Sequence, residues 1–486
     1  MNYTKIAARG TLALLASLIV ASLLGYGIRI IIARNFSPAE YGLFYAMHTL
    51  ITFLIFFRPL GTNIAMIKFI PEMKVRKQFS RIKSLIAVSI LIRLIFGAAF
   101  FSALFFLAGF LGEFYFRADP FLLRIFSFFL VLSIPYFVMS NILLGFKRIV
   151  MFSLVEVSQN FFVLLFLVLF ISLGFGIESA VYAYLIMPFL LSALYLTPAL
   201  KESKWFKNRL VDLRGTFKKT LSFGMPIMVA EFGDKIIGYF DILMLTYFVG
   251  LELVGIYNVA LPSALALLML GSAASRVALP IVSELWAKRD KKRLKIGLNI
   301  VHRYTFFLLL PAAVLLMVFS EKIIGMFFGS QYAAGALSFS ILVIGVVFFA
   351  IARINLNMIA GIGRPKTVTR IILVAAAVNV VLNLILIPIY RIEGAAVATA
   401  VSYITAFFLS TRSISKYVRS RAPWKEWIKT LVLASTLWVI IDAAMRHIGQ
   451  LYLVAVAAAL AAYCLFAFLL KIIRIKEIKK HINLAL

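Results

Sequence analysis

Long apolar segments follow one another along almost the whole chain, separated by short polar connections. Each segment has about 20 residues or more, the length that an α-helix needs to cross a hydrocarbon core about 30 Å thick. A transmembrane barrel would instead show alternating strands of about ten residues. The pattern predicts an all-α polytopic membrane protein with about fourteen transmembrane helices, over residues 11–33, 41–67, 84–111, 121–146, 149–173, 177–200, 220–249, 253–286, 297–319, 334–361, 367–388, 393–415, 427–446 and 450–471.

Composition agrees with this pattern and excludes one class of partner. The 486 residues are 63% hydrophobic and have a mean hydropathy of +1.02, values far above those of soluble globular proteins. The formal net charge of +31 would suit a nucleic-acid-binding protein. However, the basic residues lie between the apolar segments rather than on a domain of their own. We therefore expect no nucleic acid among the partners.

Lysine and arginine are distributed unevenly between the two sides of the predicted membrane. Connections after odd-numbered segments carry about one basic residue each: Arg34, Arg117, Lys322, Arg391 and Arg446. Connections after even-numbered segments carry many more, and the one between the second and third segments holds Lys68, Lys74, Arg76, Lys77, Arg81 and Lys83. Basic connections remain on the cytoplasmic side. We therefore expect a multi-pass protein of the cell (plasma) membrane with both termini in the cytoplasm.

A short glycine pattern near the start of the chain recurs in its second half. Gly25 and Gly42 have the same separation in the sequence as Gly238 and Gly255. Six apolar segments separate the copies, so the two halves are expected to be parallel repeats related by an axis along the membrane normal. The repeat predicts two pseudo-symmetric six-helix lobes and a terminal helix pair, arranged as an N-terminal lobe at 1–200, a cytoplasmic linker at 201–219, a C-terminal lobe at 220–420, and the last two helices with a basic tail at 421–486.

Acidic residues inside the membrane are concentrated in one segment. A charged side chain at the bilayer centre costs about 2.5–3.5 kcal/mol, so each one needs a physical reason. In segment 220–249, Glu231, Asp234 and Asp241 share one helical stripe with Gly238. The stripe is a candidate site for ion coupling. It fits equally a buried structural network in which Lys235 or an arginine pairs the acids, and the sequence leaves both interpretations open.

A second group of membrane charges is basic. Arginine stays charged, and its planar guanidinium matches phosphate oxygens. Residues Arg29, Arg58, Arg276 and Arg353 are therefore candidates to line a cavity for an anionic substrate. The alternative is a guanidinium that extends along its helix to the interface, which we expect for Arg93. Polar residues of segment 149–173 could pair with these arginines: Glu156, Gln159 and Asn160.

No pattern in the chain indicates an enzyme, a metal or a cofactor. The sequence lacks a GxxxxGK[ST] phosphate-binding loop, and its four histidines show no metal-ligand spacing. The longest outer connection, around residues 321–334, is too short for the catalytic part of a membrane glycosyltransferase or ligase. We therefore predict a transporter and keep the enzyme as the less favoured alternative.

Four motifs, taken in order, resemble the polysaccharide-transporter branch of the multidrug/oligosaccharidyl-lipid/polysaccharide (MOP) flippase superfamily. They are Ala33–Phe44 (ARNFSPAEYGLF), Asp241–Ala260 (DILMLTYFVGLELVGIYNVA), Ser275–Leu285 (SRVALPIVSEL) and Gly361–Lys366 (GIGRPK). The resemblance extends over the whole chain. It implies a fold like that of the MATE transporters, with two lobes around a central cavity that opens alternately to either side.

The resemblance also implies an activity. Such proteins move a polyprenyl-(pyro)phosphate-linked oligosaccharide from the inner to the outer leaflet, driven by a gradient of H⁺ or Na⁺, with membrane lipids and polysaccharide-assembly enzymes as partners. On this resemblance, the cations that face the lipid phosphate would be among Arg29, Arg58, Arg276 and Arg353. A cation-coupled multidrug antiporter of the same superfamily is the alternative: the acidic stripe favours it and the arginines disfavour it. A lipid II flippase differs from the first expectation only in its substrate.

Overall fold

The computed structural model describes residues 3–269, 282–419, 422–447, 452–470 and 472. These residues form helices joined by short connections, and the described ranges contain no β-strand. Within the same ranges, ten helical stretches are long and apolar enough to cross a membrane. The structure thus confirms the predicted all-α, polytopic membrane fold.

The remaining predicted segments also correspond to helices. The 54-residue α16 (Pro365–Val418) covers two predicted segments and bends at Arg391, where φ is 50°. That bend lies in the predicted connection between the segments 367–388 and 393–415. The other three correspond to α10 (Leu213–Phe248), α11 (Leu251–Leu265) and α18 (Tyr452–Leu469).

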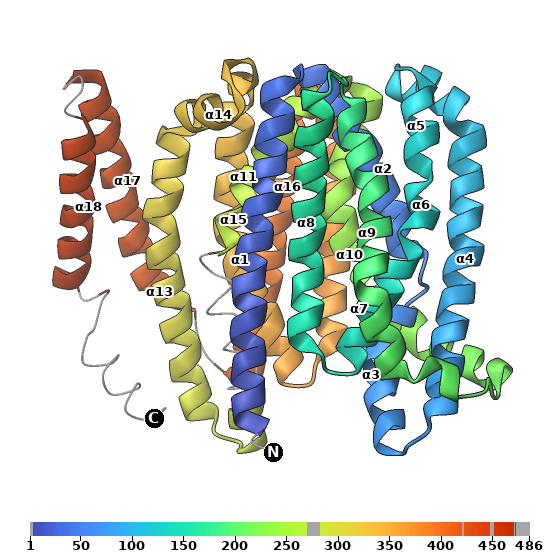
Figure 1. Cartoon of the computed structure of the whole chain (residues 1–486). Coiled ribbons are helices and arrows are strands. Elements are labelled where there is room, and N and C mark those ends of the chain that lie inside the picture. Colours follow the sequence, from blue (N-terminus) through green and yellow to red (C-terminus); the bar gives the residue numbers. More distant parts are fainter. Residues whose placement is uncertain (1–2, 270–281, 420–421, 448–451, 471, 473–486) are drawn as a thin grey trace. The chain divides into compact units, whose positions relative to one another are not determined.

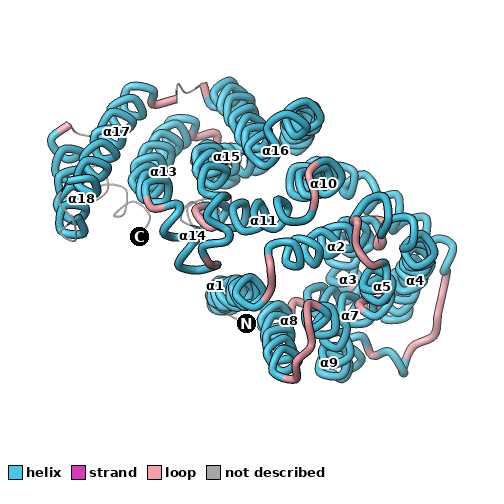
Figure 2. Tube along the Cα trace, turned by 90° about the horizontal axis from the view of Figure 1, so that it is seen from above, coloured by secondary structure: helices cyan, strands magenta, loops and turns pink. Residues whose placement is uncertain are grey.

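Contacts between the helices group the chain into two compact units, Met1–Gly255 and Ile256–Leu486, with the division inside α11. In the first unit, α8 packs against α1 and α9, whereas α4 packs against α3, α5 and α7 (Figures 1 and 2). Its other elements are α1 (Tyr3–Asn35), α2 (Pro38–Phe57), α3 (Thr62–Val75), α4 (Phe79–Phe110), the π-helix η1 (Leu111–Phe116), α5 (Pro120–Ser127), α6 (Phe129–Leu132), α7 (Ile134–Gly145), α8 (Ile149–Ser172), α9 (Glu178–Ser203) and the 3₁₀-helix η2 (Trp205–Lys207).

The second unit has a different internal packing. Its α15 packs along α16, α13 contacts both α15 and α17, and α18 packs against α17. The elements that follow α11 here, besides α16 and α18, are α13 (Lys291–Val318), α14 (Ser320–Phe328), the 3₁₀-helix η3 (Ser330–Gly335), α15 (Ala336–Gly361) and α17 (Trp424–His447).

Helix α10 belongs to the first unit by its contacts, since it packs against α2, α3 and α4. The sequence repeat instead assigns this segment to the second lobe. Packing and internal repetition are different criteria, so the repeat-based boundaries at 200 and 220 stay a prediction.

Within the first unit, α2 and α11 approach each other closely at two glycines that occupy equivalent positions of the sequence repeat. A Cβ added to Gly42 of α2 would lie 1.9 Å from the carbonyl oxygen of Leu251, and one added to Gly255 of α11 would lie 2.0 Å from that of Pro38. Pro38 and Leu251 are as far apart in the sequence as the two glycines are. Equivalent positions of the two copies therefore contact each other, as expected at a pseudo-twofold axis, and only glycine fits this approach.

The predicted segment 41–67 is interrupted in its middle. Helix α2 ends at Phe57 and α3 begins at Thr62, with Arg58, Pro59, Leu60 and Gly61 between them. Proline cannot donate a backbone hydrogen bond, and Gly61 has a φ of 79° that favours glycine. Irregular backbone at membrane depth is tolerated where it is buried in protein or lines a cavity. We therefore expect the α2–α3 break to be buried in protein or to line a cavity.

Candidate functional site

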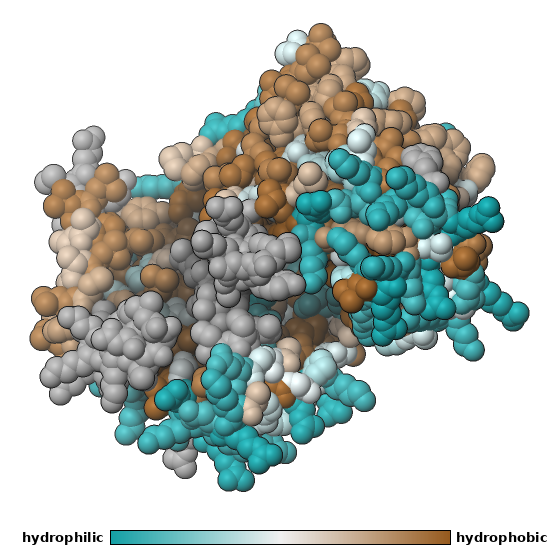
Figure 3. Space-filling model, turned by 60° about the horizontal axis from the view of Figure 1, so that its bottom comes forward, coloured by the Kyte–Doolittle hydropathy of each residue, from teal (hydrophilic) through white to brown (hydrophobic). Residues whose placement is uncertain are grey.

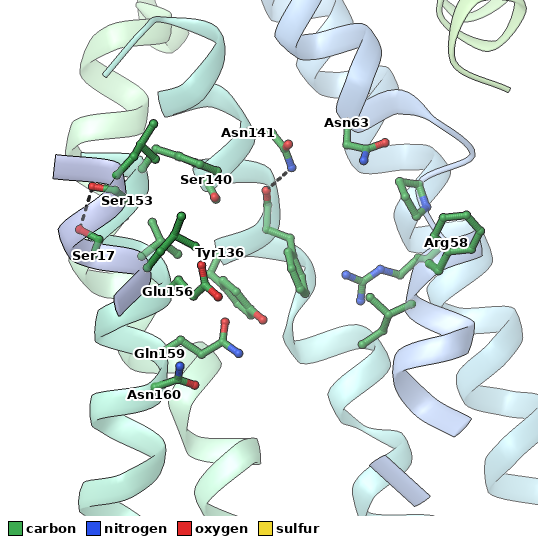
Figure 4. A pocket seen from close by; sticks show the side chains of 18 of the residues that line it. Ser17, Arg58, Asn63, Tyr136, Ser140, Asn141, Ser153, Glu156, Gln159 and Asn160 are labelled. Carbon is green, nitrogen blue, oxygen red and sulfur yellow. Dashed lines mark hydrogen bonds between the residues drawn. The ribbon is translucent and has the colours of Figure 1, made fainter. Parts of the chain in front are cut away.

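A cavity of about 710 Å³ lies inside the first unit, beside the α2–α3 break. Helices α1, α4, α7 and α8 complete its wall, and Figure 4 shows the polar side chains that converge on it. The size is within the range of small-molecule sites. The polar and charged lining residues are Ser17, Arg58, Asn63, Arg93, Tyr136, Ser140, Asn141, Ser153, Glu156, Gln159 and Asn160.

Arg58 is held at the break by contacts from three neighbouring elements. Its side chain is buried, and its Nη1 donates to the carbonyl oxygen of Leu130 and to the hydroxyl of Ser133 at 2.8 Å. Its guanidinium carbon lies 5.3 Å from the centre of the Phe137 ring. A Cβ on Gly97 would lie 3.3 Å from Cδ of Arg58, so the arginine stem crosses α4 at a glycine. These contacts fix one buried guanidinium at the cavity, and a role of Arg58 in substrate binding stays a prediction.

The prediction for Arg93 is wrong. We expected its guanidinium to reach the membrane interface, but the side chain is only 2% exposed and lines the cavity. Helix α4 begins at Phe79, before the predicted start at 84, so Arg93 lies about 21 Å along the helix. It also precedes Gly97 by one turn, which places it on the face that contacts Arg58.

Three buried donors at this site have no hydrogen-bond partner among the described residues. They are Nε of Arg58, Nη1 of Arg93 and the hydroxyl of Tyr136. A buried donor without a partner costs about 1–3 kcal/mol, and more when it is charged. Among the lining residues only Glu156 carries a carboxylate, against the two arginines. The cavity is therefore cationic and has unused donors, which is the chemistry of an anion-binding site.

In the wall opposite Arg58, some polar side chains join two helices and others point into the cavity. Asn160 of α8 donates to the carbonyl oxygen of Ala21 at 2.8 Å, and the hydroxyl of Ser17 donates to that of Ser153 at 3.2 Å, so both bonds join α1 to α8. Glu156 and Gln159 instead point toward the cavity from α8, across from Arg58 (Figure 4). Amide and carboxylate groups in this position are suited to bind hydroxyl-rich groups such as sugars.

Arg29 and Arg353 do not line this cavity. The guanidinium carbon of Arg29 lies 4.3 Å from the centre of the Tyr45 ring, within the first unit. Arg353 belongs to the second unit, where it is exposed and its guanidinium carbon lies 5.7 Å from the Phe349 ring centre. Arg276 lies outside the described residues. A role for these three in a substrate cavity stays a prediction.

The acidic stripe lies on an uninterrupted helix. On α10, Glu231, Asp234 and Gly238 are exposed, whereas Asp241 is 1% exposed. The stripe thus changes from exposed to buried along its length. Within the described ranges, no cluster of three or more His, Cys, Asp or Glu residues could hold a metal ion. A role of the stripe in ion coupling stays a prediction.

Two family models match the sequence. Residues 7–286 match the family model described as polysaccharide biosynthesis protein, and residues 226–385 match the MatE model. The first match covers more than half of the chain.

The chain belongs to the polysaccharide biosynthesis protein family.

Curated relatives of this family member agree with the assignment. An uncharacterized membrane protein of Methanocaldococcus jannaschii, MJ1068, is 30% identical over 99% of both chains. The probable low-salt glycan biosynthesis flippase Agl15 of Haloferax volcanii is 23% identical over 56% of this chain and 57% of its own length. The resemblance to the MOP flippase superfamily is thereby confirmed.

Solved structures support the fold of this family member. A lipid II flippase MurJ in an inward closed conformation matches with a TM-score of 0.76 and 16% identity, over 94% of this chain and 98% of its own. An inward-facing MATE family transporter of the MOP superfamily matches with a TM-score of 0.67 and 16% identity, over 82% and 94% of the two chains. The predicted MATE-like fold is therefore confirmed.

Proposed function

We propose that this protein moves a polyprenyl-(pyro)phosphate-linked oligosaccharide from the inner to the outer leaflet of the cell membrane by alternating access. The observation that supports this substrate is the pair of buried guanidiniums, Arg58 and Arg93, at a cavity within a membrane-embedded unit. Phosphate oxygens would satisfy the unused donors of both arginines. The topology with cytoplasmic termini is part of this proposal.

Moving a polar headgroup across the hydrocarbon core requires a polar cavity. A polar headgroup that crosses hydrocarbon loses its hydration, and an uncompensated charge there is very costly. A polar cavity supplies replacement hydrogen bonds, while the lipid tail can remain in the bilayer. Asn63, Asn141 and Gln159 add amide groups to the lining, which suits the hydroxyls of an oligosaccharide.

The names of the relatives favour the same class of substrate. Those of Agl15 and of a putative O-antigen transporter from Shigella flexneri refer to glycan biosynthesis and O-antigen transport. We propose that a gradient of H⁺ or Na⁺ drives the cycle and that Glu231, Asp234 and Asp241 take part in the coupling. Enzymes of polysaccharide assembly would supply and use the lipid-linked substrate.

A multidrug antiporter remains the second candidate because the MatE match covers residues 226–385, which include the acidic stripe. A cationic drug would be repelled by Arg58 and Arg93, however, and only Glu156 opposes them in the cavity. The arginine pair therefore favours the anionic lipid.

Transport in proteoliposomes tests the proposal. We would measure the crossing of a fluorescent lipid-linked oligosaccharide with the wild type, Arg58→Ala, Arg58→Lys and Arg93→Ala. We expect crossing by the wild type, a strong loss in both alanine variants and partial function in Arg58→Lys, which keeps the charge but not the bidentate fork. Arg124→Ala is the matched control, because Arg124 is an exposed arginine of the same unit outside the cavity lining.

Two results would overturn the proposal. Unimpaired crossing in both alanine variants would make the arginines structural. Efflux of a cationic dye by the wild type without any movement of the lipid would instead favour the antiporter.

A further inference from the structure

A second hollow of about 590 Å³ lies on the other side of α4 and α7 from the polar cavity. Helix α9 completes it, and its lining is almost wholly apolar. We call it the α4–α9 groove. Its residues are Ile86, Ile90, Leu94, Val131, Leu132, Ile134, Pro135, Val138, Met139, Ile142, Pro188, Phe189, Ser192, Leu196, Ala199, Leu200, Ser203 and Trp205.

Small residues and prolines explain why the groove is hollow. Ser192, Leu196, Ala199 and Ser203 follow one stripe of α9, and three of these four side chains are small. Pro188 extends the same wall and cannot donate a helical hydrogen bond. From Ser192 to Ser203 the stripe is about 16 Å long. This is about half of a hydrocarbon core, the depth of one leaflet.

One end of the groove has the character of a membrane interface. Trp205 lines this end, and the amine of Lys83 lies 4.9 Å from the centre of its ring. The amine of Lys204 lies 4.2 Å from the centre of the Phe79 ring. Tryptophan and lysine are both favoured where hydrocarbon meets headgroups. The groove is therefore apolar along its length and cationic at its end.

Hydrogen bonds hold the connection after α9 against the start of α4. The Lys83 amine donates to the carbonyl oxygen of Asn208 at 3.0 Å, and the backbone N–H of Val211 donates to the hydroxyl of Ser84 at 2.8 Å. Hydrophilic side chains gather at this end of the helices, which comes forward in Figure 3. Lys83 is thus kept beside Trp205 by an ordered connection.

Two acidic residues near this end are already engaged. Glu202 pairs with Arg148, and Asp212 accepts a hydrogen bond from the backbone N–H of Gly215 at the start of α10. Lys83 and Lys204 place cationic amines near this end of the groove, at the rings of Trp205 and Phe79. An occupant must therefore combine a hydrocarbon chain with an anionic head.

The transported lipid has this chemistry, but its tail cannot reach the groove. A headgroup in the polar cavity would lie across α4 and α7 from the groove, where Gly97 is closely packed against Ile134 and Arg58. One molecule cannot occupy both hollows without passing through that wall. The occupant of the groove is thus a separate lipid of the surrounding membrane.

We propose that the α4–α9 groove binds one chain of an anionic membrane lipid, whose phosphate is held by Lys83 and Lys204. The site is independent of the proposed transport, because none of its lining residues belongs to the polar cavity. A lipid that binds only the folded state stabilises it by RT ln(1 + [L]/Kd), so Tm rises with the lipid concentration.

Thermal unfolding of the full-length protein in detergent tests the site. Phosphatidylglycerol or phosphatidylcholine with the same acyl chains is titrated into the sample. We expect phosphatidylglycerol to raise Tm more than phosphatidylcholine does. The Lys83→Ala and Lys204→Ala variants should each need roughly fivefold more phosphatidylglycerol for the same shift, as expected for one lysine at an anionic surface.

Two sets of control variants distinguish lipid binding in the groove from general effects of a lost lysine or of an added bulky side chain. Lys291→Ala removes a lysine whose amine lies 5.7 Å from the Trp286 ring centre, outside the groove, and should keep the wild-type response. Ser192→Phe fills the groove and should abolish the phosphatidylglycerol-specific shift, whereas Ala193→Phe adds the same bulk on the exposed side of α9 and should not. Leu196→Trp replaces Ser192→Phe if that variant fails to fold.

The proposal is overturned if both lipids shift Tm equally in the wild type. It is also overturned if the two lysine variants keep full affinity, or if a folded groove-filling variant keeps the specific shift. None of these results bears on transport of the oligosaccharide, and a failed transport assay would leave the lipid titration interpretable.

Discussion

Helices α4 and α7 separate two hollows of opposite character. On α4, Arg93 lines the polar cavity while the next residue, Leu94, lines the apolar groove; on α7, Tyr136 and Pro135 divide in the same way. Consecutive residues of a helix point about 100° apart, so one helix can serve both sides. The apolar composition of a membrane helix therefore does not show which of its residues line a polar cavity and which line an apolar groove.

Substitutions in the polar cavity and substitutions in the α4–α9 groove are expected to change different properties of the protein. Polar groups in the cavity are incompletely satisfied and, on the proposed function, bind a ligand, so their loss should change transport more than stability. The groove side belongs to a packed hydrophobic cluster that includes Ile134, Val138 and Ile142, so a change there should alter stability first.

The largest effect is expected from Arg58→Leu. On the proposed function, the variant loses charge-assisted hydrogen bonds to phosphate, each worth about 1.5–3 kcal/mol, so two lost bonds predict a fall in transport rate of at least about 100-fold. Tm in detergent should stay equal or rise, because an apolar side chain replaces a buried charge. Initial transport rates at matched protein amounts provide the measurement. A matching loss of Tm would show that Arg58 is structural.

Next in size is Val138→Glu, which places a carboxylate on the groove side of α7. Val138 is 3% exposed within the hydrophobic cluster, so we expect a loss of stability of about 3 kcal/mol and a large drop in Tm. Ser140→Glu, two residues along the same helix, places its carboxylate in the cavity with Arg58 and Arg93 and should cost much less. Equal destabilisation of both variants would contradict the two-sided description of α7.

The sequence predicted the membrane helices well, because bilayer thickness sets their length and lysine and arginine mark the connections. It also indicated that Arg58 is a candidate cavity residue, since a charge deep in an apolar segment requires a reason, and the side chain lines the cavity. The interruption at Pro59-Leu60-Gly61 was missed although the residues are a turn signal, because the apolar run continues through them.

Arg93 could not be assigned correctly from the sequence. Its position near the end of a predicted segment suggested exposure, but burial depends on which neighbour packs on that face of α4. The face is decided by Gly97 and by helices from distant parts of the chain, which a single sequence does not pair. The same limit applies to the groove, whose apolar residues have the same composition as any lipid-facing helix.

A smaller effect is expected from Gly97→Ala in the wall between the two hollows. The new Cβ would lie 3.0 Å from Cδ1 of Ile134 and 3.3 Å from Cδ of Arg58, which predicts a loss of about 1–3 kcal/mol and a weaker transport rate through displacement of Arg58. Gly109→Ala is the control on the same helix, because its Cβ meets only Nη2 of Arg124 at 3.7 Å. This control should be neutral or stabilise by about 0.4–1 kcal/mol. Equal Tm values for the two variants would contradict the tight packing of the wall.

The smallest effect is expected at the cationic end of the groove, from Arg148→Ala. Arg148 and Glu202 form an ion pair at the surface, with side chains 55% and 17% exposed, so its removal should change stability by less than about 1 kcal/mol. The freed Glu202 carboxylate, one residue before the groove residue Ser203, should nevertheless weaken phosphatidylglycerol binding by less than about fivefold through like-charge repulsion. Adding Glu202→Gln should restore wild-type affinity in the lipid titration, since the repelling charge is then absent.

Transport should be unchanged in these variants, because both residues lie outside the cavity lining. A change in transport without a change in lipid binding would mean that the two sides of the α4–α7 pair are not independent.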